Sequence, residues 1–179
     1  MIKKVIKLSG ILCAIAIVTS LLLAVTNELT AGTIALRQQE AKNAAMISVL
    51  PAKSYNMLKS TEDYEIYAAF NDYENTGYTV SLSEYGYGGE IKLMIGINKD
   101  YTVAGVSIVD MSETAGLGDN AKKPSFTSMF VGLEEKEIAL TNSGGKIQAL
   151  SGATVTSTAV TNGVRRAVEL TKNLTAGGN

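Results

Sequence analysis

The hydrophobic residues of this chain follow three different patterns along the sequence. Near the N-terminus, residues 8–26 are uncharged and mostly apolar. In the middle, apolar residues alternate with polar ones, which is the spacing of half-buried β-strands. Near the C-terminus, Val160, Val164 and Val168 lie four residues apart, as on the buried face of a helix. Together the patterns predict a long apolar helix followed by an α+β domain.

The apolar run near the N-terminus has the length of a membrane-spanning helix. Residues 8–26 come close to the ~20 residues that cross a bilayer. Lys3, Lys4 and Lys7 precede the run, and Glu28 follows it. Because positive charge collects on the cytoplasmic side, we expect a single-pass anchor in the cytoplasmic (inner) membrane. Its N-terminus is expected in the cytoplasm and its C-terminal domain outside.

A cleaved signal peptide and a lipoprotein are the alternatives to this anchor. The apolar region of a signal peptide usually has ~7–15 residues, and no clear A-x-A cleavage site follows the run. The residues before Cys13 form a poor lipobox, because Leu12 fills a place that needs a small residue. We therefore favour an uncleaved anchor in contact with membrane lipid.

The segment after the anchor predicts a helical stalk. Residues 27–50 contain no proline, and Ile34, Ala41, Ala45 and Val49 recur at near-helical spacing. Pro51 ends the pattern, because the residue before proline avoids the helical region. The expected segments are a cytoplasmic N-terminus (1–7), a transmembrane helix (8–26), a stalk (27–50) and a folded domain (51–175).

Alternation in the middle of the chain predicts an antiparallel meander with one covered face. A polar turn is expected at residues 71–77 and a second at residues 98–100, where Asn, Lys and Asp follow one another. The apolar members of the expected strands are Ile66, Ala68 and Phe70; Tyr78, Val80 and Leu82; Ile91, Leu93, Ile95 and Ile97; and Ala104, Val106 and Ile108.

A glycine-rich loop at residues 85–89 joins two of these strands. Its spacing is not that of a nucleotide-binding fingerprint, and no helix follows it, so we reject that interpretation. The tyrosines at strand edges could stack on a flat ring, but such residues more often serve packing.

Composition narrows the possible chemistry. The net charge of −1 argues against a nucleic-acid partner, since no basic excess exists to neutralise phosphates. The chain has one Cys and no His, so an internal disulfide is impossible and a metal centre lacks its usual ligands. We expect no metal site. If the protein carries electrons, an organic cofactor is the expected carrier.

The start of the C-terminal helix is the main candidate site. Ser151-Gly152-Ala153-Thr154 stands just ahead of the helical pattern, and Thr156 and Ser157 follow. A helix start offers unpaired backbone N–H groups and suits a phosphate. On chemistry alone, an ordinary hydroxyl N-cap explains the same residues.

The same stretch resembles the flavinylation motif of the FMN-binding domain family. This family includes the G subunits of Rnf electron transport complexes and the C subunits of sodium-pumping NADH:quinone reductases. The resemblance implies FMN bound covalently through a phosphoester to Thr154, with Ser151, Gly152, Ala153, Thr156 and Ser157 beside it.

A second motif follows the last expected strand. By chemistry alone, Gly116-Leu117-Gly118 could be any tight turn. With Glu113 and Thr114, however, it resembles the Glu-Thr-x-Gly-Leu-Gly segment of Rnf G subunits, ahead of a short helix expected from residue 124 to about 130. The resemblance places Glu113, Thr114, Gly116, Leu117 and Gly118 against the cofactor or a neighbouring subunit.

The resemblance implies an electron-carrying subunit rather than a stand-alone enzyme. It would relay electrons through FMN in an Rnf-type ferredoxin:NAD+ oxidoreductase coupled to Na+ or H+ translocation. Its implied partners are other membrane subunits of the complex and, during maturation, a flavin transferase. No residue is assigned a catalytic role, because Thr154 is an attachment point.

One departure from the family keeps other functions open. Three residues before the motif serine the family commonly has Asp, whereas this chain has Gln148. A flavin-free anchored scaffold is therefore one alternative. The C subunit of a sodium-pumping NADH:quinone reductase is another, although members of that group tend to be longer than this chain.

Overall fold

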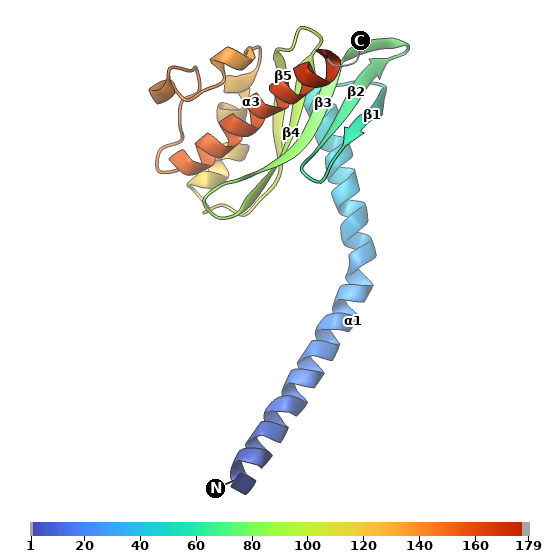
Figure 1. The fold of residues 1–179 in the computed structure, drawn as a ribbon, viewed down its shortest axis with the longest axis vertical. Helices are drawn as coiled ribbons and strands as arrows, with labels where there is room; N and C mark the ends of the chain where they lie inside the picture. Colours follow the sequence, from blue (N-terminus) through green and yellow to red (C-terminus); the bar gives the residue numbers. More distant parts are fainter. Residues whose placement is uncertain (1, 177–179) are drawn as a thin grey trace. The chain divides into compact units, whose positions relative to one another are not determined.

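The computed structural model describes residues 2–176, which divide into two compact units. The first unit ends at Ala41 and is purely helical, and the second begins at Lys42 and contains the sheet and the C-terminal helix (Figure 1). The longer elements are α1 (Ile2–Val49), β1 (Ser54–Ser60), β2 (Tyr64–Asn71), β3 (Glu74–Tyr85), β4 (Glu90–Asn98), β5 (Val103–Met111) and α3 (Thr154–Ala176). The shorter ones are η1 (Gly118–Lys122), α2 (Pro124–Thr127), η2 (Ser128–Phe130), η3 (Glu135–Glu137) and η4 (Thr141–Ser143).

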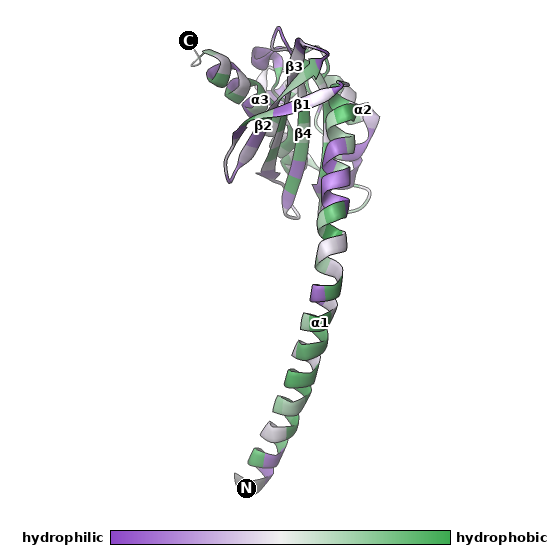
Figure 2. Cartoon of the chain, turned by 90° about the vertical axis from the view of Figure 1, so that its right-hand side faces the viewer, coloured by the Kyte–Doolittle hydropathy of each residue, from purple (hydrophilic) through white to green (hydrophobic). Residues whose placement is uncertain are grey.

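α1 is one uninterrupted helix that joins the predicted anchor and stalk. It passes through Gly32 without a break and ends at Val49, just before Pro51. Within residues 2–176 it is the one helix long and apolar enough to cross a membrane. Figure 2 shows apolar residues prevailing along its N-terminal part and more polar residues toward its C-terminal end. These properties fit a membrane anchor.

Several threonines of α1 donate their hydroxyls to backbone carbonyls of the same helix. Thr19 donates to the carbonyl of Ile15 at 3.0 Å, and Thr26 donates to that of Leu22 at 2.8 Å. Such internal bonds satisfy a hydroxyl group where no water is available. The threonines are therefore compatible with a lipid environment.

The five strands form an antiparallel meander in the order β1-β2-β3-β4-β5. This confirms the predicted sheet type and adds β1, which the alternation did not reveal. β1 is an edge strand, and nearly all of its residues are exposed, so burial imposes no apolar alternation on its sequence.

The first predicted polar turn is much shorter than residues 71–77. β2 and β3 pair up to Asn71 and Glu74, which leaves only residues 72 and 73 in the turn. Asp72 there has φ of 58°, a left-handed conformation that Asp tolerates. Polar residues at a hairpin tip can pair as strand, so polarity alone overestimated the turn.

α3 covers one face of the sheet and forms the main core with it. Val160, Val164 and Val168 are fully buried against β3 and β4, as their spacing predicted. Gly163 lets the helix approach closely, because a Cβ there would lie 2.5 Å from the Leu93 Cδ1 atom. Figure 1 shows α3 crossing the sheet on this side.

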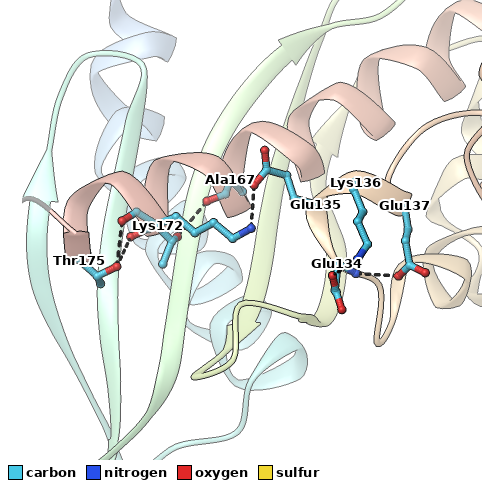
Figure 3. Close-up of polar contacts among 8 residues, drawn as sticks. Glu134, Glu135, Lys136, Glu137, Ala167, Lys172 and Thr175 are labelled. Atoms are coloured by element: carbon cyan, nitrogen blue, oxygen red, sulfur yellow. Dashed lines mark hydrogen bonds and ion pairs between the residues drawn. The ribbon is translucent and has the colours of Figure 1, made fainter.

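Short helices close the end of this core. The predicted helix from residue 124 to about 130 is divided into α2 and the 3-10 turn η2, and it buries Phe126 and Phe130 edge to face. The η3 turn is tied to α3 by the Lys172–Glu135 ion pair at 2.8 Å (Figure 3). These contacts bring the segment after β5 against the C-terminal helix.

The opposite face of the sheet is also covered, contrary to the expectation of one covered face. The last turns of α1 place Ala45, Met46 and Val49 on Met94 of β4. Gly96 and Gly105 are register partners on β4 and β5, and a Cβ on either would lie within 3 Å of the Val49 carbonyl oxygen. The sequence did not show this because the helix end is distant in the chain from the glycines that receive it.

Candidate cofactor-binding site

A cleft of about 620 Å³ lies between the start of α3 and the segment that follows β5. Its volume is within the ~300–1,000 Å³ typical of small-molecule sites. Its lining residues are Tyr87, Glu113, Thr114, Leu117, Gly118, Gly152, Ala153, Thr154, Val155 and Thr156. Residues of both motifs that the sequence singled out therefore line the same cleft.

A tight turn presents the first residue of α3 to this cleft. Gly152 has φ of 72°, which strongly favours glycine. Ala153 is buried, and its N–H donates to the Leu150 carbonyl at 3.1 Å. Below the turn, the Ser157 hydroxyl accepts from the Leu150 N–H and donates to the Ala153 carbonyl, both at 2.9 Å. These bonds hold Thr154 at the helix start.

Thr154 is the exposed first residue of α3. Its hydroxyl makes no hydrogen bond to another residue in the described part of the chain, and neither do the N–H groups of Thr154, Val155 and Thr156. A helix start with free amides and the positive end of the dipole attracts a phosphate group. The arrangement fits a phosphoester on the Thr154 oxygen, flanked by backbone donors.

Glu113 holds the wall of the cleft together. Its Oε1 atom accepts hydrogen bonds from the N–H groups of Tyr87 at 2.8 Å and Gly88 at 3.2 Å. Its Oε2 atom accepts a hydrogen bond from the Thr156 hydroxyl at 3.0 Å. Glu113 is the one carboxylate among the lining residues, and no Lys or Arg lines the cleft. A bound anion in this cleft would therefore be held by backbone N–H groups.

The 114–118 segment is a compact turn. The Thr114 carbonyl accepts from the Leu117 N–H at 3.1 Å, and the Gly116 carbonyl accepts from the Asn120 side chain at 2.7 Å. Gly116 has φ of 78°. The Leu117 side chain is 44% exposed and lines the cleft, where it offers an apolar surface to a ligand.

Most of the site residues expected from the sequence line this one cleft. Ser151, Gly116 and Ser157 do not line it. Ser157 is buried beneath the turn, where its hydroxyl bonds to the backbone. Sequence reasoning missed Val155, which stands inside the motif, and Tyr87, which belongs to the glycine-rich loop that was set aside. The glycines of that loop were the available signal, but their role depends on a distant segment.

The donors of the site suit an organic ligand. No group of three or more His, Cys, Asp or Glu side chains that could hold a metal ion occurs among the described residues. The cleft offers hydroxyls, backbone amides and apolar walls, which match an organic phosphate.

Comparison with known proteins agrees with this geometry. The RnfG N-terminal region matches residues 1–49, and the FMN-binding domain matches residues 86–169. The G subunit of the Na(+)-translocating ferredoxin:NAD(+) oxidoreductase complex of Acetobacterium woodii is 35% identical, with coverage of 96% of this chain and 94% of the relative. The chain belongs to the RnfG family.

Other RnfG relatives align over similar lengths. The G subunit of the proton-translocating ferredoxin:NAD(+) oxidoreductase complex of Clostridium ljungdahlii is 36% identical over 89% of this chain and 88% of the relative. The G subunit of an ion-translocating oxidoreductase complex of Methanosarcina acetivorans is 32% identical over 93% of this chain and 94% of the relative.

A solved structure shares the fold. It is the C subunit of the Na(+)-translocating NADH-quinone reductase from Parabacteroides distasonis, with a TM-score of 0.51 and 22% identity. The alignment covers 65% of this chain and 64% of that chain, so it spans less than two thirds of the neighbour.

Proposed function

We propose that this chain is the flavoprotein G subunit of an Rnf-type ferredoxin:NAD+ oxidoreductase that couples electron transfer to Na+ or H+ translocation. The chain supplies a membrane anchor and a domain that holds FMN, whose isoalloxazine ring carries the electrons. The observation that carries the proposal is the exposed Thr154 hydroxyl at an open helix start, inside a domain of the FMN-binding family.

The attachment is a phosphoester between Thr154 Oγ1 and the FMN phosphate, equal overall to FMN plus protein minus one water. A flavin transferase makes this bond during maturation by moving the FMN phosphoryl group from an activated flavin nucleotide to Thr154 Oγ1, with departure of the leaving group and of the hydroxyl proton. Gly152, Ala153 and Ser157 give the turn its shape, and the first amides of α3 face the phosphate. A covalent bond keeps the carrier in place through every reduction and oxidation cycle.

The test is the mass of the tryptic peptide 147–165 and in-gel flavin fluorescence after denaturation, in protein expressed with its flavin transferase. We expect the mass of one FMN minus water on this peptide, and its loss in Thr154→Ala. Thr158→Ala is the matched control, because Thr158 is an exposed threonine one turn further along α3. An unmodified native peptide, or unchanged labelling in Thr154→Ala, would contradict the attachment.

Gln148 supports the second candidate function, a flavin-free scaffold within the complex. It is exposed three residues before Ser151, where a transferase could contact it. If the missing charge limits modification, Gln148→Asp raises the fraction of flavinylated protein measured by peptide mass. A colourless native protein that still assembles with its membrane partners would favour the scaffold.

The orientation in the membrane is part of the proposal. We place the N-terminus in the cytoplasm and the domain outside, following the lysines that precede α1's apolar run. In a Cys13→Ser background, an impermeant maleimide should label Tyr73→Cys in intact cells, since Tyr73 is fully exposed at the β2–β3 turn. Lys4→Cys should react only after the cells are opened. Reversed labelling would overturn this orientation.

A further inference from the structure

The Glu113 carboxylate joins three parts of the domain that are far apart in sequence. It follows β5, it accepts two backbone N–H groups from the 85–89 loop, and it accepts the Thr156 hydroxyl from the first turn of α3. Thr156 is two residues from Thr154, and Tyr87 and Thr154 both line the cleft. One side chain therefore connects the loop that carries Tyr87 to the helix start that carries Thr154.

Two glycines leave the space that this carboxylate fills. A Cβ on Gly86 would lie 2.0 Å from Glu113 Oε1, and a Cβ on Gly118 would lie 2.6 Å from Glu113 Oε2. Neither residue has the left-handed backbone that favours glycine, so the need is for space. Similarly, a Cβ on Gly88 would lie 2.0 Å from the Ser112 carbonyl oxygen. The glycines of the loop thus form a seat for residues 112 and 113.

We propose that Glu113 is a positioning residue that fixes the Tyr87 loop to the first turn of α3 and thereby sets the wall of the cleft beside Thr154. This deepens the proposed function, on which it depends only for the identity of the ligand. Glu113 acts through Tyr87, Gly88 and Thr156. Its carboxylate oxygens accept three hydrogen bonds, and all three donors come from the protein.

The chemistry of the contact predicts how substitutions differ. Gln at position 113 keeps one oxygen for the two backbone N–H groups, and its amide can donate to the Thr156 oxygen. Asp is shorter by one methylene and cannot reach both partners. Glu113→Gln should therefore preserve the connection, whereas Glu113→Ala and Glu113→Asp should break it.

Hydrogen exchange of the loop tests the connection in full-length, flavin-free protein in detergent. With Glu113→Ala, we expect exchange at the Tyr87 and Gly88 amides to rise about tenfold, the effect of losing one hydrogen bond of ordinary strength. Glu113→Gln should stay near the wild-type rate. The matched control is Glu90→Ala, because Glu90 is exposed beside the same loop and its side chain makes no hydrogen bond or ion pair with another described residue.

A tryptophan at position 87 reports on the same contact once flavin is attached. The chain has no Trp, so Tyr87→Trp places a single tryptophan in the cleft. Its emission overlaps flavin absorption, and we expect strong quenching in the flavinylated protein. Adding Glu113→Ala or Thr156→Val should reduce that quenching, and Glu113→Gln should restore it.

Two further results separate this proposal from a general loss of stability and from the proposed function. Gly118→Ala keeps every donor and acceptor but displaces the carboxylate, so it should also raise loop exchange while unfolding remains cooperative. If native protein carries no flavin, the proposed function fails, yet the exchange measurement still tests Glu113. Loop exchange in Glu113→Ala equal to that of Glu90→Ala would overturn the positioning role.

Discussion

The two faces of the sheet are covered by helices in different ways. On one face, α3 lies over large apolar side chains such as Leu93 and Ile95, and the contact depends on buried volume. On the other face, the end of α1 lies over Met94, Gly96 and Gly105, and the contact depends on close approach of backbone atoms. The first face carries the candidate cofactor cleft at the start of α3, and the second receives the last turns of α1. One sheet thus supports both helices, through buried apolar side chains under α3 and through glycines that admit the backbone at the end of α1.

The sharpest test compares two neighbouring residues of β4 that point to opposite faces. Ile95→Ala should lower the free energy of unfolding by about 4 kcal/mol, because Ile95 is fully buried among tightly packed neighbours. Met94→Ala should cost about 2 kcal/mol, since half-buried Tyr55 and Tyr67 can move into the space. Urea unfolding of the full chain in detergent, followed by far-UV circular dichroism, measures both. Equal losses would show that the two faces do not differ as described.

Adding a methyl group should produce the opposite ranking. Gly96→Ala places a Cβ 2.4 Å from the Val49 carbonyl oxygen, a backbone atom that cannot move alone, so we expect a loss of about 2–3 kcal/mol. Gly163→Ala meets the end of the flexible Leu93 side chain at 2.5 Å, and alanine favours the helix by ~1 kcal/mol. Its net effect should stay within ~1 kcal/mol in the same measurement. If Gly96→Ala is as stable as the wild-type protein, the close contact between the end of α1 and the sheet is contradicted.

A polar contact on the α1 side predicts that the stability of the domain depends on pH. Lys42 pairs with Glu65, and its Nζ atom donates to the Tyr67 hydroxyl at 2.9 Å. Burial raises the pKa of Glu65, but hydrogen bonds from Lys42 and Tyr67 outweigh it and hold that pKa below the ordinary value of 4.5. Burial likewise lowers the pKa of Lys42, yet its bonds to Glu65 and Tyr67 leave it above 10.5.

The sign of the effect follows from these directions. Glu65 contributes stability above pH 4.5, and this is lost as the pH falls through its lower folded pKa. Lys42 contributes below pH 10.5, and this is lost as the pH rises through its higher folded pKa. Lys42→Met should remove about 1 kcal/mol or less near neutral pH and flatten both ends of the unfolding profile. Unfolding curves at several pH values check this, with Lys53→Met, from an exposed ion pair with Asp72, as the control.

The smallest effect is expected at the end of α3. Lys172→Met removes the partly exposed ion pair with Glu135, which should cost no more than about 0.5 kcal/mol. A loss above about 1 kcal/mol in the urea measurement would mean that the η3 turn depends on this contact more than its exposure indicates.

Local patterns predicted the elements with a repeating environment. The spacing of Val160, Val164 and Val168 predicted α3, and the alternation around Ile91–Ile97 predicted β4, because each repeat reflects one continuous apolar surface. β1 escaped prediction because an exposed edge strand has no such constraint. The covering of the second face depended on Gly96 and Gly105, whose role is visible only when residues distant in sequence are brought together.

In the candidate site, too, local motifs could be predicted, whereas contacts between distant segments could not. The resemblance singled out residues on both sides of the cleft, because their motifs are short and contiguous. It missed Tyr87, and it gave Glu113 a direct contact with the cofactor or with another protein of the complex. The structure shows this carboxylate lining the cleft and bonded to the Tyr87 loop and to Thr156. Three-dimensional contacts between separate segments were needed to see that arrangement.

The packing of the last turns of α1 on the sheet decides where the chain can be cut to release a soluble domain. A fragment that begins at Pro51 loses Ala45, Met46 and Val49, and so uncovers Met94 and the two glycines. It also loses the carbonyl of Leu50, which accepts the Tyr55 hydroxyl at 2.6 Å. A fragment that begins a few residues before Lys42 keeps all of these and the Glu65 pair. The useful truncation point therefore lies inside the helix, more than two turns before its end.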